Sequence, residues 1–106
     1  MIVTTSETIA NTRIVRTLGI VRGNTVRARH IGKDILAGLR NIVGGEVHEY
    51  AKLIAESREQ SLDRMVKEAA DLGANAIIAT RFTTSVMMGG AAELLAVGTA
   101  VIVEDA

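Results

Sequence analysis

The chain lacks several residue types, and each absence excludes a class of protein. It has no cysteine among its 106 residues, so disulfide frameworks, thiolate metal sites and iron–sulfur clusters are excluded. It has no proline, so we expect neither a long linker nor a proline-rich docking segment. Its aromatic residues are limited to Tyr50 and Phe82, which leaves no stacking platform for single-stranded nucleic acid.

The chain also lacks an excess of charge of either sign. Its 12 basic and 12 acidic residues give a net charge of zero, which argues against a dominant electrostatic contact with nucleic acid. No apolar run approaches the roughly 18 residues of a membrane span, and the first residues have no secretory pattern. We therefore expect a cytoplasmic protein that binds neither nucleic acid nor membrane.

Small and aliphatic residues dominate what remains. The hydrophobic fraction is 48%, and the core must be built from Ile, Val, Leu, Ala and Met. The length predicts a single domain over residues 1–106. A small apolar chain of this kind often covers its remaining apolar surface by forming an oligomer.

Alternation and β-branched residues predict strands at 2–5, 13–29, 74–88 and 92–104. The second is either one long strand or a hairpin that turns near Gly23 and Asn24. Gly89 and Gly90 predict a hairpin turn between the last two strands. The last strand is apolar or small on both faces, so one face can pack on a helix while the other needs a second cover. We infer an oligomer interface through the sheet.

Two helices are predicted between these strands. A short helix over 34–42 ends at Gly44 and Gly45, which favour a left-handed cap. A long helix over 46–72 follows, about 40 Å in length, and stops at Gly73. Its expected buried face contains Val47, Ala51, Ile54, Ala55, Arg58, Leu62, Met65, Val66, Ala69 and Leu72.

Four segments carry a family resemblance: GLRNIVGG at 38–45, LGANAII at 72–78, GTAV at 98–101 and GIVRG at 19–23. They resemble, in order and over nearly the whole chain, the YbjQ-like family of bacterial and archaeal proteins, described as heavy-metal-binding domains. The resemblance implies an α+β fold, with an antiparallel sheet packed against one long helix plus a short helix. It also implies a ring-forming subunit, assembled as a pentamer or a pair of pentamers.

The candidate metal ligands are His30, His48, Glu46 and Glu49. The resemblance implies a divalent or soft metal ion as the cofactor. Some relatives carry acidic residues in the strand after the GANA segment, whereas residues 80–84 here read TRFTT and contain no carboxylate. This departure weakens the metal hypothesis.

Two further groups have competing interpretations. Met87 and Met88 could bind a soft ion such as Cu(I), but apolar residues at a contact between subunits explain them better. The backbone N–H groups after Gly44 could bind an anion at the start of the long helix. Glu46 and Glu49 already occupy that positive end, so structural capping is the favoured interpretation.

Arg40 and Arg58 are the polar residues of greatest interest. A charge within an apolar face must be paired, so we expect structural ion pairs between elements or subunits. The alternative is that both arginines line a ring cavity and bind an anionic ligand. No serine has the context of a nucleophile. The favoured function is a homo-oligomeric binding or scaffold module. Heavy-metal binding is the alternative, and an enzyme with an intersubunit site ranks third.

Overall fold

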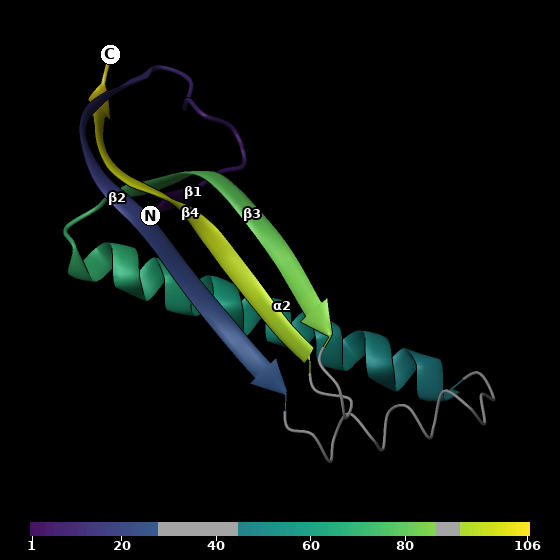
Figure 1. The fold of residues 1–106 in the computed structure, drawn as a ribbon. Coiled ribbons are helices and arrows are strands. Elements are labelled where there is room, and N and C mark those ends of the chain that lie inside the picture. Colours follow the sequence, from purple (N-terminus) through teal and green to yellow (C-terminus); the bar gives the residue numbers. More distant parts are fainter. Residues whose placement is uncertain (28–44, 87–91) are drawn as a thin grey trace.

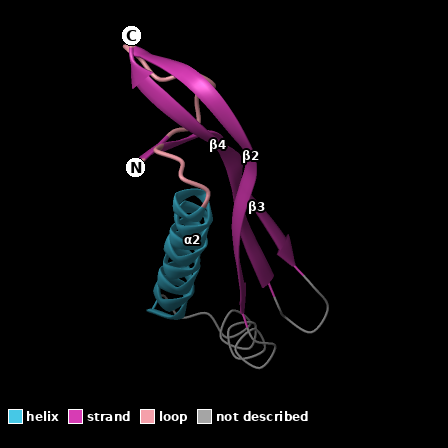
Figure 2. Ribbon diagram, turned by 90° about the vertical axis from the view of Figure 1, so that its left-hand side faces the viewer, coloured by secondary structure: helices cyan, strands magenta, loops and turns pink. Residues whose placement is uncertain are grey.

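A computed structural model describes residues 1–27, 45–86 and 92–106, and these form an α+β unit. In chain order the elements are β1 (Ile2–Val3), β2 (Thr12–Arg27), α2 (Gly45–Asp71), β3 (Ala76–Val86) and β4 (Ala92–Asp105). The strands form one sheet in the order β1-β3-β4-β2. Helix α2 lies along one face of this sheet (Figure 1), and the opposite face carries no helix in the described part of the chain (Figure 2).

The sheet is mixed, although an antiparallel sheet was expected from the sequence. Strand β4 pairs antiparallel with both β2 and β3, but β1 pairs parallel with the start of β3 through Ile2↔Ala76 and Val3↔Ile77. The prediction was wrong because the two residues of β1 give no local signal of the direction in which they pair. The hairpin alternative for 13–29 was also wrong, since Gly23 and Asn24 pair with β4 in the middle of a continuous strand. The short helix at 34–42 and the turn at Gly89 and Gly90 lie outside the described residues.

A β-bulge in β3 changes which side chains face the helix. The register jumps between Ile78 and Arg81, so that Ala79 and Thr80 together oppose Gly98, and Ala79 adopts a φ of 53°. An extra residue inverts the alternation of the strand beyond it. Ile77 and Phe82 therefore face the same side of the sheet, although strict alternation places them on opposite faces.

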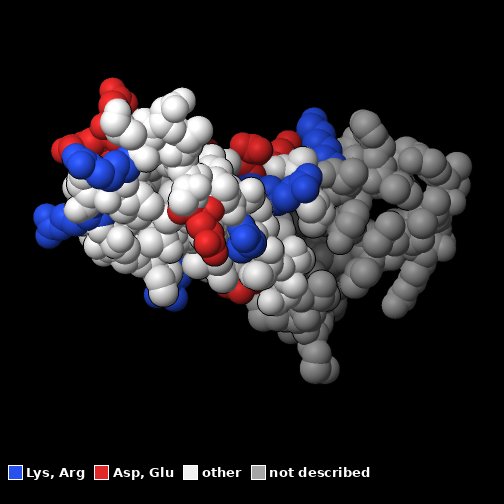
Figure 3. Space-filling view, turned by 90° about the horizontal axis from the view of Figure 1, so that it is seen from above, with Lys and Arg blue, Asp and Glu red and all other residues white. Residues whose placement is uncertain are grey.

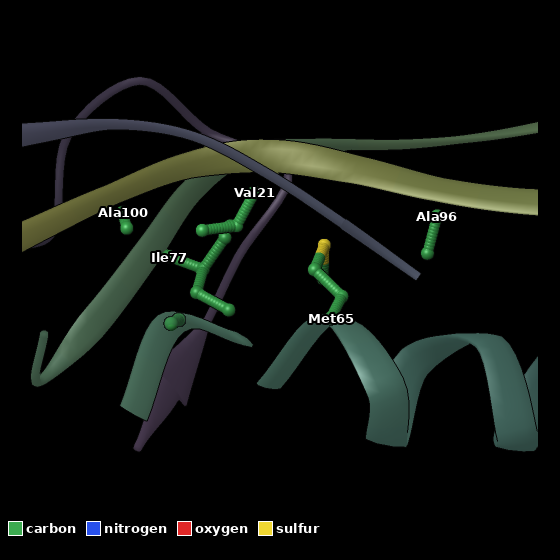
Figure 4. Close-up of a cluster of buried hydrophobic side chains, with 6 residues drawn as sticks. Val21, Met65, Ile77, Ala96 and Ala100 are labelled. Carbon is green, nitrogen blue, oxygen red and sulfur yellow. The ribbon is translucent and has the colours of Figure 1, made fainter. Parts of the chain in front are cut away.

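Helix α2 begins and ends within one residue of the predicted range, but its buried face differs from the prediction. The most buried positions recur every four residues, at Ser57, Ser61, Met65 and Ala69. Arg58 is exposed rather than part of this face, and Leu72 lies beyond the helix with 49% of its surface exposed. Met65 and Ala69 join a core whose sheet residues all point toward the helix: Val21, Ile77, Ala96 and Ala100 (Figure 4).

The helix approaches β2 unusually closely at Gly23. A Cβ atom at this glycine would lie 2.2 Å from the Ser61 carbonyl oxygen and 2.4 Å from the Met65 nitrogen. Buried hydroxyls join the two layers beside this point: Ser61 Oγ donates to the Leu94 carbonyl at 2.9 Å and accepts from Thr25 Oγ1 at 2.9 Å. The helix is thus fixed over β2 by close backbone contact and by satisfied polar groups as well as by apolar burial.

A smaller core lies on the other face of the sheet at one end. Ala76, Val101 and Val103 are buried there, with Ile9 of the β1–β2 connection packed against them. The connection also follows the edge of β3, where Thr4 N donates to Ile77 O at 2.9 Å and Ala79 N donates to Ser6 O at 2.8 Å. The molecule is elongated, with extents of 55 × 23 × 16 Å. No helix in the described ranges combines the length and apolarity needed to cross a membrane.

Candidate functional site

An open groove runs between α2 and the part of β3 that follows the bulge. The helix packs mainly on β2 and β4; it covers Ile77 before the bulge in β3 but leaves the inner face of β3 beyond the bulge exposed. Phe82 faces this side of the sheet, yet 45% of its surface is exposed. The groove has a volume of about 740 Å³ and is lined by Phe82 and by Lys52, Ala55, Glu56, Arg58, Glu59, Gln60 and Leu62 of α2.

The groove combines a small apolar surface with balanced charge. Its apolar contacts come from Phe82, Leu62 and Ala55, while Lys52 and Arg58 are matched by Glu56 and Glu59. The surface in Figure 3 shows the same mixture, with basic and acidic side chains close together and broad uncharged areas between them. Such a surface suits a peptide segment or another protein better than a strongly charged small ligand.

Arg58 is the one candidate site residue whose side chain the structure describes. It is exposed on α2 and lines the groove, so it does not need the buried partner that the sequence suggested. His30 and Arg40 lie outside the described residues, as do Met87 and Met88. The other metal candidates, Glu46, His48 and Glu49, lie in the first turns of α2.

The described side chains do not supply a heavy-metal site. Among them, no group of three or more His, Asp or Glu side chains converges, and the chain has no cysteine. Soft metals favour thiolate and imidazole ligands. The two histidines of the chain, His30 and His48, are both candidate ligands, and their side chains are not among the described ones.

The segment LGANAII proves to be a structural joint. Gly73 adopts a φ of +88°, which allows the chain to leave α2. Asn75 then binds the backbone of β4 through both ends of its amide: Nδ2 donates to Val103 O at 2.9 Å and Oδ1 accepts from Val103 N at 2.8 Å. The segment thereby ties the end of the helix to the sheet.

The buried hydroxyl cluster was missed by sequence reasoning. Ser57, Ser61 and Thr25 lie in the helix–sheet interface and are at most 4% exposed. The spacing of the two serines at i and i+4, in line with Met65 and Ala69, was the available signal. Because Ser61 donates to the Leu94 carbonyl and accepts from Thr25, these hydroxyls hold the layers together and do not form the nucleophile of an enzyme.

The sequence comparisons agree with this architecture. A family model described as "Putative heavy-metal-binding" matches residues 1–104. A UPF0145 protein of Archaeoglobus fulgidus is 58% identical over 101 residues, covering 95% of this chain and 94% of that protein. A UPF0145 protein of Dehalococcoides mccartyi is 57% identical over 104 residues, covering 98% of this chain and all of that protein.

One solved structure is similar in fold. It is the crystal structure of a protein of unknown function from Pediococcus pentosaceus, assigned to the DUF74 family, with a TM-score of 0.66 and 16% identity. The match covers 98% of both chains, so the likeness extends over the whole architecture. With the family match over residues 1–104 and relatives above 50% identity, this chain belongs to the YbjQ-like family of UPF0145 proteins.

Proposed function

We propose that this chain is a homo-oligomeric binding or scaffold module, pentameric or decameric, and not an enzyme. The observation that carries the proposal is the outer face of the sheet, the face turned away from α2 (Figure 2). On it Ile20 and Val26 of β2 are 68% and 52% exposed, beside the half-buried Leu95 and Val97 of β4.

A sheet that stands alone in water normally carries polar side chains on its exposed face. Here four aliphatic side chains, Ile20, Val26, Leu95 and Val97, share the outer face with polar side chains such as Arg22 and Asn24, and in the described part of the chain only the β1–β2 connection covers this face, at one end. An aliphatic patch on a small protein indicates a protein–protein contact. A second copy is the favoured partner because it offers the same surface at equal concentration.

Native mass spectrometry of the untagged protein tests the proposal. We expect five or ten subunits, and we expect Ile20→Glu to shift the assembly toward smaller species while retaining the circular dichroism spectrum. Lys67→Glu, on the exposed surface of α2, is the control and should leave the assembly intact. A wild-type protein that is monomeric at micromolar concentration would refute the proposal.

Heavy-metal binding is the second candidate, supported by the family description rather than by the described side chains. Elemental analysis of protein purified without a histidine tag tests it. Stoichiometric metal that disappears in the His30→Ala, His48→Ala double variant would establish it. Metal-free protein that does not retain added Zn²⁺ or Cu⁺ on gel filtration would exclude it.

A further inference from the structure

The sheet has two free edges in the described part of the chain. Strand β2, with 16 residues, forms one edge along its whole length. At the other edge β1 and the connection after it accompany β3 only as far as Thr80, whose nitrogen donates to Thr4 O at 3.0 Å. Along residues 81–86 the edge of β3 that faces away from β4 is therefore unpaired. Free backbone groups on a long exposed strand are a template for pairing with another chain.

We propose that β2 of one copy pairs in parallel with residues 81–86 of β3 in the next copy. The inference rests on the proposed homo-oligomer and specifies how its subunits meet. Both strands are antiparallel to β4, so β2 and β3 run in the same direction. A rotation about an axis roughly along the strands preserves this direction and brings the β2 edge of one subunit to the β3 edge of its neighbour. Such a head-to-tail contact uses both edges and can close into a ring.

The charge of β2 disfavours pairing with itself. The strand contains Arg13, Arg16, Arg22 and Arg27 and no acidic residue, so a two-fold β2–β2 contact would bring like charges together. The free part of the β3 edge carries less positive charge than β2. Arg81 is the only charged residue of β3, and the adjoining groove contains two acidic and two basic side chains. Pairing of β2 with β3 thus avoids the β2–β2 repulsion and covers the free part of the β3 edge together with part of the β2 edge.

The position of α2 supports the same arrangement. The helix is fixed over β2 at Gly23 and leaves the inner face of β3 open beyond the bulge, so the groove lies beside the free part of the β3 edge. A neighbour that adds its β2 there would bring its own α2 to the far side of the groove. Three strands per subunit separate equivalent helices by about 14 Å, compared with the 8–10 Å of direct helix packing. The space between them would contain Phe82 and Arg58, and both subunits would line it.

Cysteine cross-linking tests the pairing cleanly because the natural chain has no cysteine. Arg22→Cys on β2 would be combined with Arg81→Cys, Thr83→Cys or Ser85→Cys on β3, four exposed positions on the outer face. Within one subunit these strands are separated by β4, about 10 Å apart, too far for an intrachain disulfide. Parallel neighbours about 5 Å apart satisfy disulfide geometry. Arg22→Cys with Lys67→Cys is the control pair.

After mild oxidation with copper phenanthroline, we expect at least one of the three pairs to give a covalent ladder that ends at the ring size. Each single variant and the control pair should remain uncross-linked. Dimers from Arg22→Cys alone would overturn the proposal in favour of a two-fold contact. The absence of a ladder in all three pairs would also overturn it. Native mass spectrometry of the same samples separates the two failures, since an intact oligomer without a ladder refutes only the pairing, whereas a monomer refutes the oligomer too.

Discussion

The close contact between α2 and β2 predicts that Gly23→Ala is severely destabilising. The added Cβ atom would lie 2.2 Å from Ser61 O, 2.4 Å from Met65 N and 2.8 Å from Arg64 Cβ. Two of these atoms belong to the backbone of the helix, so no change of rotamer can relieve the clash. To restore ordinary contact distances the helix must move away from β2 by about 1 Å.

The cost of that movement can be worked out from the contacts it disturbs. Overpacking in a close-packed interior costs about 1–3 kcal/mol. The same shift stretches the hydrogen bonds from Thr25 to Ser61 and from Ser61 to Leu94, each worth about 1 kcal/mol. We therefore expect the free energy of unfolding to fall by about 3–5 kcal/mol. Even 3 kcal/mol corresponds to a decrease in Tm of about 12–24 °C for a domain of this size.

Urea unfolding followed by far-ultraviolet circular dichroism measures this loss, at a fixed protein concentration because the proposed assembly would also contribute to stability. Gly19→Ala is the matched comparison on the same strand. A Cβ atom there meets nothing within 4 Å, but the φ of +124° makes any side chain strained. Its expected cost is about 1–2 kcal/mol. If Gly23→Ala proves no more destabilising than Gly19→Ala, the helix is not seated on β2 as described.

Three further predictions follow from individual contacts. Thr80 Oγ1 is buried without a hydrogen-bond partner among the described residues, so Thr80→Val should raise the free energy of unfolding by about 1 kcal/mol. Thr25→Val removes a bonded hydroxyl and should lower the free energy of unfolding by about 1 kcal/mol. Thermal melts that show the same sign for both variants would contradict this reasoning. Asn75→Ala should cost about 2 kcal/mol in urea unfolding, because two hydrogen bonds to Val103 are lost, and a change below about 0.5 kcal/mol would show that water replaces them. Arg13→Ala should change stability by less than about 0.5 kcal/mol, since its 3.3 Å ion pair with Glu104 is exposed, and a larger loss in the same assay would indicate an additional contact.

Much of the fold could be predicted because its signals are local. Helical periodicity and the flanking glycines placed α2 within one residue of its ends, and alternation located β3 and β4. The errors concern features that depend on distant partners. The bulge exists because Ala79 and Thr80 together oppose the single residue Gly98 on another strand. The parallel pairing of β1 depends on the position of β3, which lies far from β1 in the sequence. Ser57 and Ser61 are polar residues that the helical pattern did not place on the buried face, but both are buried in the interface between helix and sheet, where the Ser61 hydroxyl forms hydrogen bonds.

The candidate site could be predicted less well, for a geometric reason. The groove exists because α2 lies over β2 rather than over the centre of the sheet. This position depends on Gly23, which has no side chain and so lets the helix backbone come close to β2. Nothing in the spacing of Arg58 and Phe82 along the chain indicates that they line the same groove. Arg58 was expected on the buried face of the helix, and its exposure could not be inferred from a helical pattern that placed it beside buried residues.

The segments that carry the family resemblance therefore have structural roles wherever they are described. Gly23 and Gly98 allow close approach, since a Cβ at Gly98 would lie 2.6 Å from Ile77 Cγ2, while Gly73 and Asn75 join the helix to the sheet. Residues with these roles fix the orientation of α2 and so determine which surfaces remain uncovered. In the described ranges those surfaces are the outer face with exposed Ile20 and Val26, the edge of β2, the edge of β3 beyond Thr80, and the groove beside Phe82. The groove adjoins the free part of the β3 edge, whereas the β2 edge lies on the opposite side of the sheet, so the proposed head-to-tail contact between copies would cover an edge and wall the groove at the same time. In the proposed assembly, the binding function of this chain would therefore be sought where two copies meet.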